Sequence, residues 1–208
     1  GNYNSITKTV DFLTPHFSKY VIGYNNIAFT DVGKSDWYYD AVSYITAREI
    51  SKGTGVNTFG PNMSLTRGQF LVLVMNAYNI KPDADTADNF EDAGDTYYTG
   101  YLAAAKRLGI TKGTGGSLFA PDAVISRQDM VTLLYNILNQ ANELPENKGQ
   151  NNIGTFNDAE LIDSYAEESM RILVESGLIS GSNGRLNPKG TATRAEMAQI
   201  LYNLLIIK

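Results

Sequence analysis

Three arginines, each directly after a threonine or serine, are the residues of this chain best suited to bind an anion. They are Arg67, Arg127 and Arg194, in the segments LTRGQF, ISRQDM and ATRAEM. Each is expected at a helix start, where backbone N–H groups without partners favour anions. A cation there is disfavoured by about 0.3–1 kcal/mol. Either the guanidinium binds a carboxylate or phosphate, or it points to solvent or pairs with an acidic residue of the Phe-x-Asp segment that opens each repeat.

A glycine turn precedes each arginine, and two of the three turns add a lysine. The segments are SKGTG, TKGTG and ISGSNG. The residues concerned are Lys52 and Gly53, Lys112 and Gly113, and Ser180 and Gly181. If each turn faces the arginine of its own repeat, the first two repeats carry two cations and the third carries one. The alternative for the glycines is a left-handed residue that ends a helix.

Aromatic and acidic residues also recur at fixed places. Before the first helix of each repeat stand Trp37, Tyr97 and Tyr165. Their rings suit the apolar face of a sugar, and they suit a hydrophobic core equally well. A Phe-x-Asp segment opens each repeat and supplies Asp31, Asp92 and Asp158. These carboxylates are candidate ligand-binding groups, or they cap the turn that follows.

Signatures of enzymes are missing from the sequence. It has no G-x-S-x-G, P-loop, H-E-x-x-H or EF-hand segment. It has no cysteine, which excludes disulfides and thiol chemistry, and its one histidine, His16, cannot form a multi-histidine metal site. We therefore expect no enzyme, metal or cofactor. The net charge of −5 argues against nucleic acid, and no apolar run reaches the ~18 residues of a membrane span.

Each repeat is predicted to be a helix, a turn and a second helix. The first helices are expected over 37–50, 97–109 and 165–177. The second helices carry apolar residues at positions i, i+3, i+4, i+7 and i+8, a strong amphipathic pattern. Their expected N-caps are Thr66, Ser126 and Thr193, and Gln69 and Glu196 complete two capping boxes.

The repeats span 29–81, 90–142 and 156–208, and polar linkers cover 81–89 and 142–155. Units of about 60 residues are near the lower limit for folding alone. We therefore predict one all-α body whose core is supplied largely by the second helices. Residues 1–28 lie outside the repeat and are predicted as two short strands or extended segments. They would be a linker or the tail of a preceding β domain.

Together these features resemble the S-layer homology (SLH) domain, over about residues 29–207. The resemblance rests on Phe-x-Asp, an aromatic before a helix, the glycine turn, Phe-x-Pro, and Thr-Arg-x-Glu before an amphipathic helix. LGITKGTGGSLFAPDAVISRQDM and TRAEMAQILYNLL match it well. The departures are Gly68-Gln69 and Gln128-Asp129 in place of Ala-Glu, and a third turn without lysine.

The resemblance implies a pseudo-threefold helical body with three grooves between neighbouring units. It implies non-covalent anchoring of an exported protein to secondary cell wall polymer, through a pyruvate ketal on an amino sugar. The groove arginines would be Arg67, Arg127 and Arg194, and the turn residues Gly53, Gly113 and Gly181. The chain would be the C-terminal end of a larger extracellular protein, with its export signal upstream. The alternative is a protein–protein scaffold in a surface layer, with possible self-association.

A cation at a helix start contributes little to stability, which leads to an expectation for the arginines. Replacing each by alanine should leave the fold intact and weaken binding by about 1.5–3 kcal/mol. The loss should be larger at Arg67 and Arg127 than at Arg194, if the lysines lie beside the first two.

Overall fold

A computed structural model describes residues 2–4, 7, 9–11, 28–146 and 151–206. Within these residues the chain is helical after one antiparallel pair of short strands, β1 (Asn2–Asn4) and β2 (Thr9–Asp11). Two helices belong to each repeat: α1 (Tyr39–Ala47) and α2 (Arg67–Ala77), α3 (Thr99–Arg107) and α4 (Arg127–Gln140), and α5 (Glu167–Glu175) and α6 (Arg194–Ile206). Three 3-10 turns precede α5: η1 (Ile153–Thr155), η2 (Ala159–Leu161) and η3 (Ser164–Ala166). The predicted all-α repeats are confirmed.

The N-terminal prediction can be compared only in part. The first predicted extended segment is SITKTVDFLT (5–14); β2 lies inside it, and β1 pairs with β2. The second predicted segment, and His16, lie outside the described residues.

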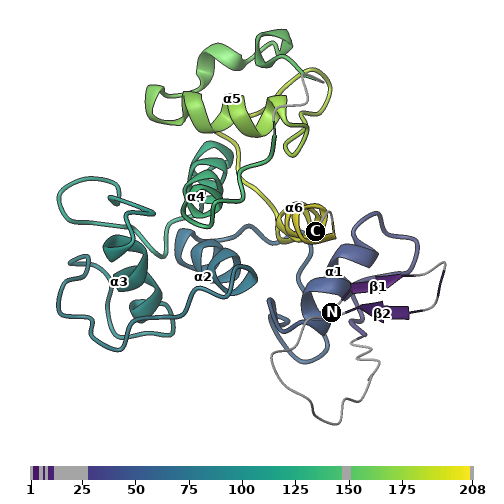
Figure 1. Ribbon diagram of the computed structural model, residues 1–208, viewed down its shortest axis with the longest axis horizontal. Coiled ribbons are helices and arrows are strands. Elements are labelled where there is room, and N and C mark those ends of the chain that lie inside the picture. Colours follow the sequence, from purple (N-terminus) through teal and green to yellow (C-terminus); the bar gives the residue numbers. More distant parts are fainter. Residues whose placement is uncertain (1, 5–6, 8, 12–27, 147–150, 207–208) are drawn as a thin grey trace.

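The repeats form a closed ring. Figure 1 shows α2, α4 and α6 around the centre and α1, α3 and α5 on the outside. Each second helix packs against the first helix of the next repeat, so that α2 contacts α3 and α4 contacts α5. α6 contacts α1, which joins the third repeat back to the first. No repeat therefore packs by itself.

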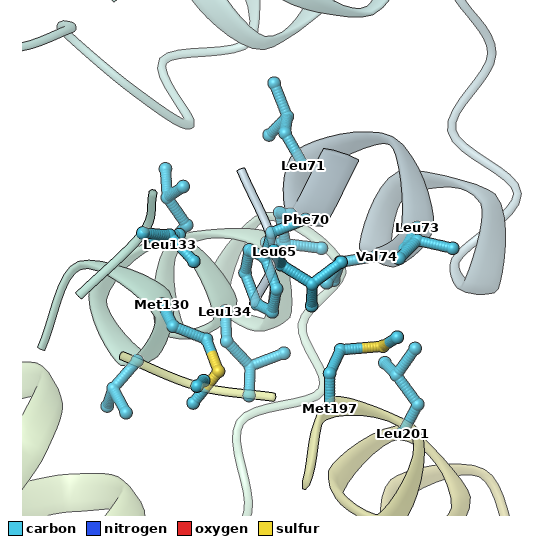
Figure 2. Close-up of a cluster of buried hydrophobic side chains, with 14 of the residues drawn as sticks. Leu65, Phe70, Leu71, Leu73, Val74, Met130, Leu133, Leu134, Met197 and Leu201 are labelled. Atoms are coloured by element: carbon cyan, nitrogen blue, oxygen red, sulfur yellow. The ribbon is translucent and has the colours of Figure 1, made fainter. Parts of the chain in front are cut away.

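The second helices supply the shared core, as predicted from their apolar spacing. In Figure 2 buried side chains from the three repeats point toward one another between these helices. They include Leu65, Phe70, Val74, Met130, Leu134, Met197 and Leu201. Burying an apolar side chain of this size stabilises the fold by about 1.5–3 kcal/mol. A single repeat of this length would bury too few such side chains to be stable by itself.

The N-caps of the second helices are those predicted. Thr66 Oγ1 accepts from Gln69 N at 3.3 Å while Gln69 Oε1 accepts from Thr66 N at 3.1 Å. Thr193 and Glu196 form the same reciprocal pair, at 3.2 and 2.7 Å. Ser126 Oγ accepts from the backbone N–H of Asp129 at 3.2 Å.

The turn glycines do not end the first helices, so that alternative is wrong. The left-handed residues after α1, α3 and α5 are Glu49, Gly109 and Gly177. The turn glycines are needed for close packing instead. A Cβ on Gly53, Gly113 or Gly181 would lie 2.9, 2.8 or 2.5 Å from the ring of the Phe-x-Asp phenylalanine of the same repeat. It would also meet a backbone carbonyl across the turn.

Candidate functional site

The free N–H groups expected at the second-helix starts are already occupied. Arg67 N donates to Ala123 O and Gly68 N to Pro121 O, both at 2.9 Å. The same two bonds recur at α4, to Gly190 O and Pro188 O, and at α6, to Met63 O and Pro61 O. The third N–H is held by the N-cap side chain. The premise that these backbone groups wait for an anion is therefore wrong, and an anion site at the helix starts would have to be made of side chains.

Each arginine reaches the turn of the following repeat rather than its own. Arg67 Nε donates to Phe119 O at 2.9 Å, and Arg127 Nε donates to Leu186 O at 3.0 Å. Arg194 Nε closes the ring by donating to Phe59 O at 2.8 Å. We name the three contacts junction A (Arg194 with the turn of repeat 1), junction B (Arg67 with repeat 2) and junction C (Arg127 with repeat 3).

This pairing changes which lysine stands beside which arginine. Junction A joins Arg194 to the turn that carries Lys52, and junction B joins Arg67 to the turn that carries Lys112. Junction C joins Arg127 to the turn without a lysine. The prediction that Arg194 faces the turn without a lysine is therefore wrong. It assumed that each arginine faces the turn of its own repeat, whereas each contacts the turn of another repeat.

The aspartates of Phe-x-Asp hold the same peptide segments from the other side. Asp31 accepts from Phe59 N and Gly60 N, each at 2.8 Å. Asp92 does the same for Phe119 and Ala120, and Asp158 for Leu186 and Asn187. Both oxygens of each carboxylate thus bind backbone N–H groups. These aspartates therefore cap the turn, as the second of the two predictions had it. Their hydrogen bonds also hold in place the residue whose carbonyl each arginine binds.

The arginines are largely buried, and their guanidinium groups bind backbone carbonyls of another repeat instead of standing free in solvent. Arg67 and Arg194 are each only 6% exposed, and their guanidinium groups lie 4.9 and 4.6 Å from the ring centres of Phe119 and Phe59. Arg194 Nη2 also donates to Lys52 O at 2.9 Å. Burial lowers the pKa of Arg194, while Tyr97 and Asp31 oppose that shift. The premise that Arg67 and Arg194 are surface charges is therefore wrong, and we now expect their removal to destabilise the fold.

The acidic partners of the arginines come from the capping position of the next second helix. Arg67 Nη1 lies 3.2 Å from Asp129 Oδ2, and Arg127 Nη1 lies 3.1 Å from Glu196 Oε1. The equivalent residue at junction A is Gln69. Within the described residues no aspartate or glutamate oxygen lies within 4.0 Å of Arg194. At junctions B and C the arginine therefore does pair with a carboxylate, as the structural alternative predicted. That carboxylate comes from the capping position of a second helix and not from the Phe-x-Asp segment.

The three predicted aromatic residues are exposed. At each junction the aromatic residue comes from the repeat that supplies neither the arginine nor the turn: Tyr97 at junction A, Tyr165 at junction B and Trp37 at junction C. Trp37, Tyr97 and Tyr165 are 62%, 63% and 55% exposed, which disfavours their use as core residues. Tyr165 Oη donates to Asp129 Oδ1 at 2.8 Å at junction B, and burial together with Asp129 raises its pKa. Tyr97 interacts electrostatically with Arg194 at junction A.

Junction C contains an open cavity of about 1000 Å³, which we name groove C. Its predicted wall residues are Trp37, Arg127, Asp158, Ser180 and Gly181, contributed by all three repeats. The lining also includes Glu196, predicted only as a helix cap, and residues that the sequence did not single out, among them Asn157, Asn183, Arg185 and Asn187. The Asn-Gly pair before Arg185 is a hairpin-turn signal that could have drawn attention to this residue.

The grip of Asp31 on the turn gives an expected dependence on pH. Burial raises the pKa of Asp31, but the N–H groups of Phe59 and Gly60 and the charge of Arg194 outweigh it, so the pKa lies below its usual value. A carboxyl whose folded-state pKa is lowered stabilises the fold above its unfolded pKa and loses that effect as pH falls. The stability advantage of wild type over Asp31→Asn should be full near pH 6, about 1–2 kcal/mol, and should shrink below about pH 4. Urea unfolding of both proteins across that range measures it. An advantage that stays constant down to pH 3 would contradict the assignment.

Comparison with known proteins identifies the repeat. The S-layer homology domain matches three times, at residues 28–71, 89–131 and 155–198. The chain belongs to the S-layer homology domain family. SLH domains are non-catalytic modules of cell-surface proteins, and this membership supports a surface-anchoring role. Among the described residues, no helix of the SLH repeats has the length and apolar character needed to cross a membrane.

Relatives of this SLH chain include both layer proteins and enzymes. It is 32% identical over 176 residues to the S-layer protein sap of Bacillus anthracis, covering 83% of the chain and 20% of that protein. It is 30% identical over 209 residues to the amylopullulanase of Thermoanaerobacterium thermosulfurigenes, covering 99% of the chain and 11% of the enzyme. An exoglucanase XynX of Acetivibrio thermocellus is 30% identical over 183 residues, 86% of the chain and 16% of the enzyme. The chain thus spans a fifth or less of these proteins.

Proposed function

We propose that this chain anchors a larger protein to the cell wall by binding secondary cell wall polymer at its junctions. The recognised unit is a pyruvylated amino sugar, which offers both a sugar ring and a carboxylate. The observation that carries the proposal is groove C, where Trp37, Arg127 and Ser180 from three different repeats line one open cavity.

The chemistry of the junctions suits such a ligand. An exposed indole offers a flat apolar face for a sugar ring, and asparagine side chains in the groove can bind hydroxyl groups. Lys52 and Lys112 are exposed beside the turns of junctions A and B and can pair with a carboxylate. Backbone and side chains are held by the arginine and aspartate contacts before any ligand arrives, which lowers the entropic cost of binding.

Retention on purified wall polymer tests this proposal. The chain should sediment with native polymer, and chemical removal of the pyruvate groups should weaken its apparent affinity at least about tenfold, since a charged hydrogen bond contributes about 1.5–3 kcal/mol. Equal retention on both polymers would refute carboxylate recognition. Failure to bind either polymer, together with binding to a surface-layer protein, would favour the scaffold alternative.

A further inference from the structure

Groove C contains a cation that the repeat pattern does not supply elsewhere. Arg185 stands directly before Leu186, the residue whose carbonyl binds Arg127. The equivalent positions before Phe59 and Phe119 hold Thr58 and Leu118, which are uncharged. Arg185 is exposed and lines the groove.

Except for Glu160, the other charged residues that line the groove are already engaged. Arg127 binds the Leu186 carbonyl and the Glu196 carboxylate, so its positive charge is largely neutralised. Asp158 uses both oxygens on backbone N–H groups. Ser180 stands where the other turns have lysine. Within the described part of the chain, no aspartate or glutamate oxygen lies within 4.0 Å of the Arg185 guanidinium, although the exposed Glu160 also lines the wall.

A rigid hairpin turn positions Arg185. Ser182 N donates to Arg185 O at 2.9 Å, and Arg185 N donates to Ser182 O at 3.0 Å. Between them, Asn183 and Gly184 have φ values of 52° and 70°, the pattern of a two-residue type I′ turn. Directly opposed residues of a hairpin present their side chains on the same face, and both Ser182 and Arg185 line the groove.

The turn also places this cation close to the position of the missing lysine. The close approach of Gly181 to the Arg185 carbonyl brings the two arms of the turn together, and Ser180 precedes that glycine. The turn of repeat 3 therefore carries its cation on the arm opposite to the one that carries lysine in repeats 1 and 2. Its planar guanidinium can bind a carboxylate in bidentate fashion, which the ammonium of lysine cannot.

We propose that Arg185 is the residue of groove C that pairs with the carboxylate of an acidic sugar, in the role that Lys52 and Lys112 have at junctions A and B. This proposal rests on the function proposed above. It makes groove C an acidic-sugar site despite its lack of the turn lysine, and it makes Arg185 the residue that distinguishes acidic from neutral sugars there.

The chain offers a reporter for this groove alone, because Trp37 is its single tryptophan and lines groove C. The probes are the methyl glycoside of a pyruvylated N-acetylhexosamine and the same sugar without pyruvate. Trp37 fluorescence and the indole N–H resonance are followed during titration, and calorimetry counts total binding. The variants are Arg185→Gln, Arg185→Lys and, as a control that removes an exposed charge outside the groove, Lys81→Gln.

Arg185→Gln should weaken binding of the acidic sugar at the Trp37 reporter by about 10- to 100-fold, as expected for a lost charged hydrogen bond. Binding of the neutral sugar should change less than about twofold, Arg185→Lys should recover part of the affinity, and Lys81→Gln should match wild type. Thermal melting of each variant checks the fold. Wild-type affinity in Arg185→Gln would overturn the inference.

Two further outcomes separate this inference from the function on which it rests. Calorimetric binding of the acidic sugar with no response at Trp37 would refute the role of groove C and leave junctions A and B as the binding sites. No calorimetric binding of the acidic sugar to wild type would refute both proposals.

Discussion

Gly113→Ala should destabilise the protein by about 2–5 kcal/mol, one of the largest losses expected from a single added methyl group. Gly113 has φ +80°, where an alanine costs about 1–2 kcal/mol. Its Cβ would also lie 2.8 Å from the Phe90 ring and inside contact distance of the Leu118 carbonyl, which adds about 1–3 kcal/mol of overpacking. Chemical denaturation of the purified variant measures the loss.

Gly109→Ala is the matched control, because it separates the two contributions. Gly109 has nearly the same φ, +71°, but no atom within 4 Å of the added Cβ. It should lose only about 1–2 kcal/mol. If both variants lose the same amount, the close approach of the turn to Phe90 is not a real constraint on the fold.

Arg194→Ala should destabilise the protein by about 3–4 kcal/mol. Arg194 is only 6% exposed, and its side chain donates hydrogen bonds to the carbonyls of Phe59 and Lys52. Hydrogen bonds to charged groups contribute about 1.5–3 kcal/mol each, and the loss also leaves the buried carbonyl of Phe59 without its donor. The desolvation of the guanidinium offsets part of this, so the two contributions do not add fully.

Arg171→Ala is the control for the removal of an arginine as such. Arg171 is on the surface of α5 and pairs with Glu175 one helical turn away, with its side chain 49% exposed. Its loss should cost no more than about 0.5 kcal/mol. Wild-type stability in Arg194→Ala would show that junction A does not hold the ring closed.

The local structure was predictable from sequence because local chemistry determines it. The N-caps at Thr66 and Thr193 and the apolar stripe of α6 depend on residues three or four positions apart, and both were predicted. The three repeats were visible because each carries the same turn and cap residues. The first helices begin two residues later and end two or three residues earlier than predicted. Each is followed by a left-handed residue, but at α1 this is Glu49, a position that no glycine marks in the sequence.

The sequence identified individual site residues but not which of them lie together, because the site is assembled by contacts between repeats. Arg67 reaches the turn that carries Lys112 through a hydrogen bond to the Phe119 carbonyl, 52 residues along the chain. Nothing in the spacing of Arg194 indicates that its partner is Phe59, 135 residues earlier. The burial of the arginines was missed for the same reason, since the carbonyls that surround them belong to another repeat.

The closed ring has a consequence for the order in which the protein is made. In a linear solenoid each repeat contacts only its neighbours. Here the last helix also contacts the first repeat, because Arg194, at the start of α6, donates to the carbonyl of Phe59, 135 residues earlier. Glu196 of the same helix pairs with Arg127 at junction C. A chain whose α6 has not yet been made therefore cannot complete junction A or junction C, and closure of the ring depends on its last helix.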